Sequence, residues 1–121
     1  MNINRAMSGV MALLLSAAAL TSAHAFDGHE RWIDIANETG RTVTGVYATN
    51  VGDIEWGRNL LRGERLADGD TRRVEPRIHD GYCRFDLRVD LANGRQFTHW
   101  RVNLCRATAL VCTSSGCTVQ Y

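Results

Sequence analysis

The sequence predicts an all-β protein: a small antiparallel β-sandwich or half-open barrel with one short helical insertion and two disulfides. Three observations support this fold class. Six or seven short runs rich in β-branched and aromatic residues are separated by turn-forming residues. The runs do not alternate with long helices, as the strands of a parallel sheet would. Four cysteines occur in a chain of 121 residues that begins like an exported protein.

The first predicted strands are residues 32–36 and 42–47. Isoleucine, valine, threonine and tyrosine fit a pleated, half-buried surface, and both runs contain such residues. Between them, the segment Asn37 to Gly40 is rich in turn formers. We therefore expect these two strands to pair as a hairpin.

An irregular segment and a third strand follow. Residues 53–61 show no alternation, and Asp53 is a residue type that caps helices, so this segment predicts a short helix or an ordered loop. Residues 71–75 predict a strand that Pro76 ends, because proline lacks a backbone N–H donor.

The clearest pattern lies between Cys83 and Leu91, where apolar and charged residues alternate. The alternation predicts one buried face and one solvated face. Asn93 and Gly94 favour a two-residue hairpin turn after this strand. The expected register pairs Ala92 with Arg95, Leu87 with Trp100, Asp86 with Arg101, and Phe85 with Val102. Trp32 and Trp100 are accordingly expected in or beside the core.

The cysteines predict two disulfides rather than a metal site, since an exported domain with an even cysteine count oxidises its thiols and none is spaced C-x-x-C. Of three formal connectivities, pairing neighbours closes the shortest loops and would stabilise the fold by about 3 and about 2 kcal/mol. The bonds are then Cys83 to Cys105 and Cys112 to Cys117. The hairpin register sets Cys83 against Leu104, so the first bond requires a bulge or a strand that ends near Leu104.

Residues 1–25 have the three parts of an export signal: a positive start, an apolar stretch at 10–20, and small residues at Ala23 and Ala25. The apolar stretch of about 11 residues is shorter than the roughly 20 that span a bilayer as a helix. We therefore expect cleavage after Ala25 and a single domain, residues 26–121, in the periplasm or secreted.

Charge excludes two partner classes. The chain has 14 basic and 13 acidic residues, and removing Arg5 with the signal leaves 13 of each. Nucleic acids and anionic membranes both require an excess of positive charge. We expect neither as a partner after signal cleavage.

Several segments carry recognisable patterns: 35–40, Val46-Tyr47, 56–61, 66–69, 83–89 and 102–105, which contain Asn-x-Thr-Gly, Trp-Gly-x-Asn-Leu-Leu, Cys-x-Phe-Asp-Leu-Arg-Val and Asn-Leu-Cys. Together these segments resemble a family of small exported proteobacterial proteins of unassigned function. The resemblance covers nearly all of the mature chain up to Cys105. It implies a periplasmic β-sandwich and supports the Cys83–Cys105 bond, but implies no reaction and no ligand.

Candidate interaction residues fall into two groups. Trp56 is either the aromatic anchor of a binding loop or, the interpretation the sequence favours, a plug at one end of the sandwich. The expected solvated face of the later hairpin carries charged and imidazole side chains that bind an anion or a partner, or form solvated ion pairs. These residues are Asp86, Arg88, His99 and Arg101.

Acidic residues in the predicted loops are weak candidates for calcium, which takes six to eight oxygen ligands. They are Asp53, Glu55, Asp68, Asp70 and Asp80, and they lack EF-hand spacing. Ser114 and Ser115 lie in a hairpin loop without the Gly-x-Ser-x-Gly context of a nucleophile. The sequence therefore predicts no catalytic residue and no cofactor.

The expected function is non-catalytic binding of an unknown protein or envelope component. The alternatives are a calcium or other metal-binding sandwich module and a small periplasmic hydrolase. The sequence leaves the oligomeric state open.

Overall fold

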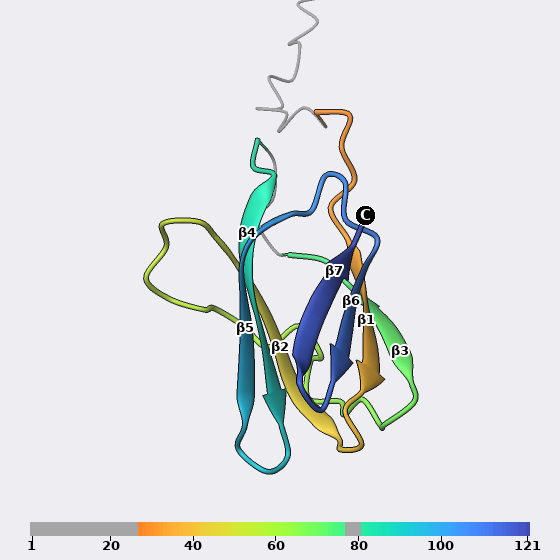
Figure 1. The fold of residues 1–121 in the computed structure, drawn as a ribbon. Helices are drawn as coiled ribbons and strands as arrows, with labels where there is room; N and C mark the ends of the chain where they lie inside the picture. Colours follow the sequence, from red (N-terminus) through yellow and green to blue (C-terminus); the bar gives the residue numbers. More distant parts are fainter. Residues whose placement is uncertain (1–26, 77–80) are drawn as a thin grey trace, which may run out of the picture.

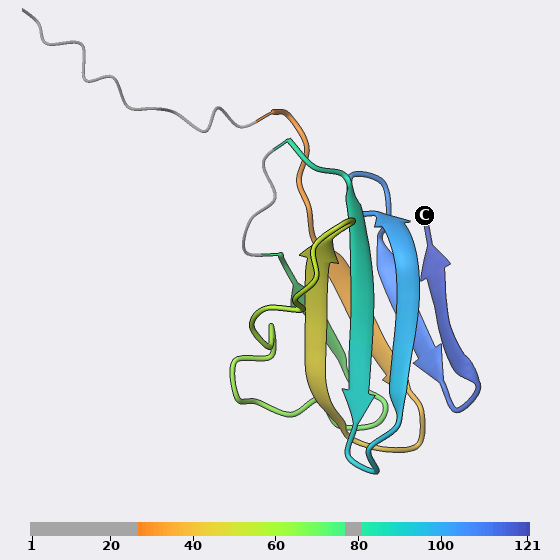
Figure 2. The same ribbon diagram turned by 90° about the vertical axis from the view of Figure 1, so that its left-hand side faces the viewer.

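A computed structural model of the chain describes residues 27–76 and 81–121. Seven strands form two sheets that pack face to face (Figures 1 and 2). The strands are β1 (Ile33–Glu38), β2 (Val43–Asn50), β3 (Thr71–Val74), β4 (Arg84–Leu91), β5 (Gln96–Asn103), β6 (Ala109–Thr113) and β7 (Gly116–Gln120). One sheet has the order β3-β1-β6-β7 and the other β2-β4-β5. The all-β prediction is confirmed.

Residues 53–61 form turns and loop, so the predicted helical insertion is wrong. Asp53 lies in this segment, but its carboxylate accepts a bond from the hydroxyl of Thr49 in β2 instead of capping a helix. Nowhere in 27–76 and 81–121 does the chain form a helix long and apolar enough to cross a bilayer.

The predicted hairpin between β1 and β2 is also wrong, because the two strands belong to different sheets. β1 lies between β3 and β6 and runs parallel to β6, whereas the other paired strands are antiparallel. The turn between β1 and β2 is held by Asn37, which is buried. Its side chain donates to the carbonyls of Arg41 and Leu66 and accepts from Thr39. Turn chemistry of this kind serves a corner between sheets as well as a hairpin.

The core lies between the sheets and consists of inward residues of the strands together with loop residues such as Leu61 and Leu104. Its largest fully buried members are Phe85, Ile33, Ile35, Leu61, Leu87, Leu104, Leu110, Val43, Val46, Val89 and Val102. Burying each such side chain stabilises the fold by about 1.5–3 kcal/mol. The buried face predicted for residues 83–91 is thus confirmed, but the expected solvated face is not, because Asp86 is buried and the side chains of Arg88 and Asp90 are only 19% and 20% exposed.

The β4–β5 hairpin differs from the predicted register near its turn. Three residues, Ala92 to Gly94, form the loop, with Gly94 at a φ of +84°. Leu87 consequently lies opposite His99 and not Trp100. A bulge at Trp100 and Arg101 then restores the predicted pairing of Phe85 with Val102.

Both predicted disulfides are present. β5 ends at Asn103, and the backbone N–H of Leu104 donates to the carbonyl of Cys83, so Cys105 leaves the ladder and bonds to Cys83 with Cα atoms 5.2 Å apart. This is the strand end that the sequence required. Cys112 and Cys117 face each other directly, with Cα atoms 4.0 Å apart.

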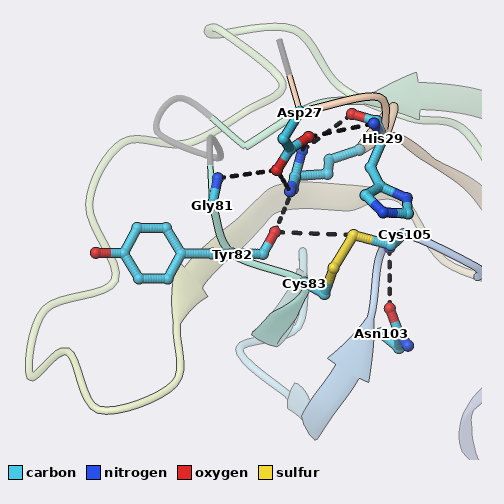
Figure 3. Close-up of polar contacts among 8 residues, drawn as sticks. Asp27, His29, Gly81, Tyr82, Cys83, Asn103 and Cys105 are labelled. Carbon is cyan, nitrogen blue, oxygen red and sulfur yellow. Dashed lines mark hydrogen bonds and ion pairs between the residues drawn. A yellow bond between two sulfur atoms is a disulfide. The ribbon is translucent and has the colours of Figure 1, made fainter. Parts of the chain in front are cut away.

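A buried arginine fastens the segment before β1 beside the first disulfide. Arg31 is only 3% exposed and donates to both carboxylate oxygens of Asp27, to the carbonyl of His29 and to that of Tyr82. The same Asp27 carboxylate accepts from the backbone N–H of Gly81 (Figure 3). The hydrogen bond from Arg31, with those from the backbone, holds the pKa of Asp27 far below its usual range.

Candidate interaction surface

The loop between β2 and β3 is anchored at one point by Asn59. Its Oδ1 atom accepts from the backbone N–H groups of Val46 and Leu61 at 3.1 and 3.0 Å, and its Nδ2 atom donates to the carbonyl of Thr44 at 3.0 Å. Leu61 is fully buried beyond this anchor. The second half of the Trp-Gly-x-Asn-Leu-Leu pattern therefore holds the loop in place, while residues 51–58 project from the sheet (Figure 1).

Trp56 does not plug an end of the sandwich. It lies with its ring centroid 6.0 Å from that of Trp100 and at 35° to it. The guanidinium of Arg88 is 5.3 Å from the Trp56 ring and 4.3 Å from the ring of Tyr47. Both are within cation–π range. These four residues, Tyr47, Trp56, Arg88 and Trp100, form what we call the aromatic surface, on the outer side of the β2-β4-β5 sheet.

The β5 bulge exposes Trp100. Two residues, Trp100 and Arg101, occupy the space opposite Asp86, and Arg101 has a φ of +55°. The backbone N–H of Arg101 donates to Oδ1 of Asp86 at 2.9 Å, and Asp86 is only 8% exposed. Trp100 is 62% exposed as a result, so its predicted core position is wrong.

The bulge also divides the predicted polar face. Asp86 and Arg88 share the outer side of β4, and Arg101 lies at the bulge beside Asp86. His99 pairs with buried Leu87 and so faces inward, where its Nδ1 atom is buried without a hydrogen-bond partner in the described structure. Placing His99 on the solvated face was therefore wrong.

Arg88 is held flat against the sheet. Its Nε and Nη2 atoms donate to the two carboxylate oxygens of Asp90 at 3.0 and 3.1 Å, and both side chains are about 80% buried. The carboxylate of Asp90 thus neutralises the charge of Arg88 within the protein.

Gly45 leaves room for the ring of Tyr47, because a Cβ atom at this glycine would lie 2.8 Å from Cε2 of Tyr47.

Residues of the loop and of the end of β2 line a pocket of about 520 Å³. Ile54 lines it and is 97% exposed, and Asn50 contributes an Oδ1 atom that is buried without a hydrogen-bond partner among the described residues. The rest of the lining is Thr49, Asp53, Glu55, Gly57 and Arg58. Volumes of this order suit small ligands or a side chain of a partner.

The metal candidates are dispersed. Asp53 and Glu55 line the pocket, whereas Asp68 accepts from the N–H of Gly40, Asp70 lies at the start of β3, and Asp80 lies outside the described residues. Within 27–76 and 81–121 no three histidine, cysteine or acidic residues gather as a metal would require. The structure therefore adds no ligand set to the calcium hypothesis.

The other sheet carries a separate pair. Arg73 donates to both oxygens of Asp34 at 2.8 and 3.1 Å, and its guanidinium lies 3.5 Å from the Trp32 ring centroid. The hydrogen bond from Arg73 lowers the pKa of Asp34, and the same bond raises the pKa of Arg73. Trp32 is half-buried, but it lies with Arg73 and Asp34 on the outer side of this sheet and does not pack against the core, so its expected place in or beside the core is wrong.

The sequence did not identify Tyr47, Trp100 and Ile54 as residues of a candidate interaction surface. The outward position of Tyr47 follows from the alternation of β2 and could have been derived. The position of Trp100 depends on the bulge, which no local residue pattern reveals.

No family model and no curated protein matches this sequence. Among solved structures, the chain is similar to the NMR structure of a protein from Eubacterium rectale, with 18% identity and a TM-score of 0.51 over 77% of this chain and 88% of that one. Identity at this level shows the fold alone. The resemblance to the exported family stays a prediction.

Proposed function

We propose that the protein is an exported, non-catalytic binding domain that recognises another protein through the aromatic surface and the adjoining loop. The observation that carries the proposal is the pair of tryptophans outside the core. Trp100 is 62% exposed and packs on Trp56, and Ile54, 97% exposed, lies on the same loop as Trp56. Large apolar side chains gathered on one surface are typical of an interaction site.

The sulfur chemistry supports an oxidising compartment. Two disulfides, and no free cysteine among the described residues, are typical of a protein that folds in an oxidising, extracytoplasmic setting. Together with the predicted signal at residues 1–25, this supports the periplasm as the place of binding.

The composition of the surface favours a protein partner. Tryptophan, tyrosine and arginine are the residues that contribute most of the binding energy in protein interfaces. Exposed charged residues lie nearby in the loop and at the bulge, namely Asp53, Glu55, Arg58 and Arg101. An apolar centre with a polar rim is the usual anatomy of such interfaces. Since Asp90 neutralises Arg88, the centre offers no excess charge for a polyanion.

Site-specific photocrosslinking tests this proposal. A photoreactive phenylalanine analogue would replace Ile54 in the exported protein, and in a matched control it would replace Tyr121, which is 65% exposed at the end of the other sheet. We expect a discrete crosslinked protein at position 54 only. The partner, once purified, is then titrated with the mature protein.

The tryptophan variants give the decisive measurement. Trp100→Ala should weaken binding of that partner by about 1–3 kcal/mol, or roughly tenfold or more, as for other interface anchors. Tyr121→Ala should leave the affinity unchanged. Equal affinities for wild type and Trp100→Ala would refute the proposal, and crosslinking to a glycan alone would replace the protein partner with a carbohydrate.

A further inference from the structure

Sheet edges expose unpaired backbone groups, and three of the four edges here are protected. The loop closes the edge of β2: Val46 donates to Asn59 and accepts from Leu60, and Val43 forms a bridge with Leu66. The edge strand β3 has only four residues, two of which are arginines. β5 is interrupted by its bulge. Coverage, shortness, charge and bulges are the devices by which proteins prevent edge-to-edge pairing.

β7 has neither a charge nor a bulge, although β5 of the other sheet packs beside it. Its sequence, Gly-Cys-Thr-Val-Gln, contains no charge and no proline, and its register with β6 is regular from Gly116 to Gln120. It lies next to β6 at the border of the four-stranded sheet, so that its free edge faces away from β6 (Figure 2). The Cys112–Cys117 disulfide holds this strand to β6, so the edge is already ordered.

The backbone groups at this edge can be assigned. The Cα distance of 4.0 Å between Cys112 and Cys117 identifies a non-hydrogen-bonded pair, for which about 4.5 Å is usual against about 5.5 Å for a bonded pair. The carbonyl of Gly116 accepts a bond from the hydroxyl of Thr113, and the carbonyl of Gln120 accepts one from the backbone N–H of Thr108, so both carbonyls point to the β6 side. By alternation, the N–H and C=O groups of Cys117 and Val119 point away from β6.

We propose that β7 pairs antiparallel with β7 of a second copy of this chain, about a two-fold axis at Thr118. In this register Cys117 of each copy exchanges two hydrogen bonds with Val119 of the other, so that all four outward groups are satisfied. Thr118 faces its own counterpart as a non-hydrogen-bonded pair. The two four-stranded sheets then form one continuous sheet.

The strand is suited to its own copy. A two-fold axis sets the same residue against itself, so a charge at Thr118 would meet a like charge. Threonine opposite threonine is instead a favourable cross-strand pair. Since β7 carries no charge that would select an acidic or basic strand, its complementarity is to an uncharged strand of the same kind.

Two variants of the mature protein test this inference, each with a control at Thr71, an exposed threonine on the β3 edge. Thr118→Cys should form an intermolecular disulfide under mild oxidation and double the mass on a non-reducing gel, faster than Thr71→Cys. Thr118→Lys sets like charges opposite each other and should abolish the wild-type dimer in analytical ultracentrifugation, whereas Thr71→Lys should leave it intact.

Both results are required. A wild-type protein that stays monomeric at the highest soluble concentration overturns the proposal, as does a dimer that persists in Thr118→Lys. Crosslinking of Thr118→Cys no faster than that of Thr71→Cys overturns it as well. Because Thr118 is exposed on the sheet that does not carry the aromatic surface, these outcomes are independent of the proposed binding function.

Discussion

The carboxylate of Asp86 accepts a hydrogen bond from the backbone N–H of Arg101 at 2.9 Å, and this bond lies at the β5 bulge. Asp86 is thereby linked to the exposure of Trp100, the residue just before Arg101. The aromatic surface thus depends on a buried acid on the neighbouring strand, and four measurements test this and related arrangements.

Asp86→Ala should destabilise the protein and alter the environment of Trp100. Removing the acceptor leaves the Arg101 N–H without its partner, which costs about 1–3 kcal/mol for a buried group. Urea unfolding gives the free-energy change, and tryptophan fluorescence reports the aromatic surface. Asp86→Asn keeps an acceptor oxygen and should lose less stability. Equal effects of the two substitutions would show that the hydrogen bond does not hold the bulge.

Local pattern predicted some parts of this hairpin and missed others for a physical reason. The alternation from Cys83 to Leu91 determined which face of β4 is buried, and the strand end after Asn103 is one of the two arrangements that disulfide geometry required near Leu104. The bulge at Trp100 and Arg101 could not be predicted from the local pattern, because an extra residue in β5 depends on its pairing with Asp86 in β4. An Asn-Gly pair fits a three-residue loop as well as a two-residue turn.

The same limit applies to β1 and β6. Their parallel pairing joins segments more than 70 residues apart, and neither sequence differs from that of an antiparallel strand. Charge and alternation placed Asp86 and Arg88 on the outer side of β4, but did not predict that both are largely buried there. They could not bring Trp56 to Trp100, since that contact needs both the loop anchor at Asn59 and the bulge.

Asn59→Ala tests the loop anchor. The variant loses three hydrogen bonds with the backbone of Thr44, Val46 and Leu61, and we expect a loss of about 1–3 kcal/mol in unfolding free energy. Amide hydrogen exchange should also become faster in residues 51–61. The matched control is Asn93→Ala, which removes one exposed turn bond to Arg95. Should both variants have the same stability and exchange, the loop is held by its apolar residues alone.

Asp27 should make the fold acid-sensitive. Its folded-state pKa is depressed below the ordinary value of 3.8 by the bond from Arg31, so its stabilising contribution is complete above that value. The contribution is lost as the pH falls from about 4 toward the folded pKa. The melting temperature of the wild type should decrease over this window, and Asp27→Asn should decrease less.

Asp34→Asn serves as the comparison, because the pKa of Asp34 is also lowered, but by an ion pair on the outer side of the other sheet. Asp34→Asn should reduce the fall in melting temperature at acid pH less than Asp27→Asn does. A profile for Asp27→Asn that parallels the wild type would mean that the Arg31 pairing does not contribute to acid sensitivity.

His99→Leu should stabilise the protein. The imidazole faces the core opposite Leu87, and its Nδ1 atom is buried without a partner among the described residues. Replacing an unsatisfied polar group with an apolar one of similar size removes a desolvation penalty, and we expect a gain of about 1 kcal/mol. Thr98→Leu, on the exposed side of the same strand, should bring no such gain. A loss of stability in His99→Leu would instead indicate that Nδ1 bonds to an ordered water inside the sandwich.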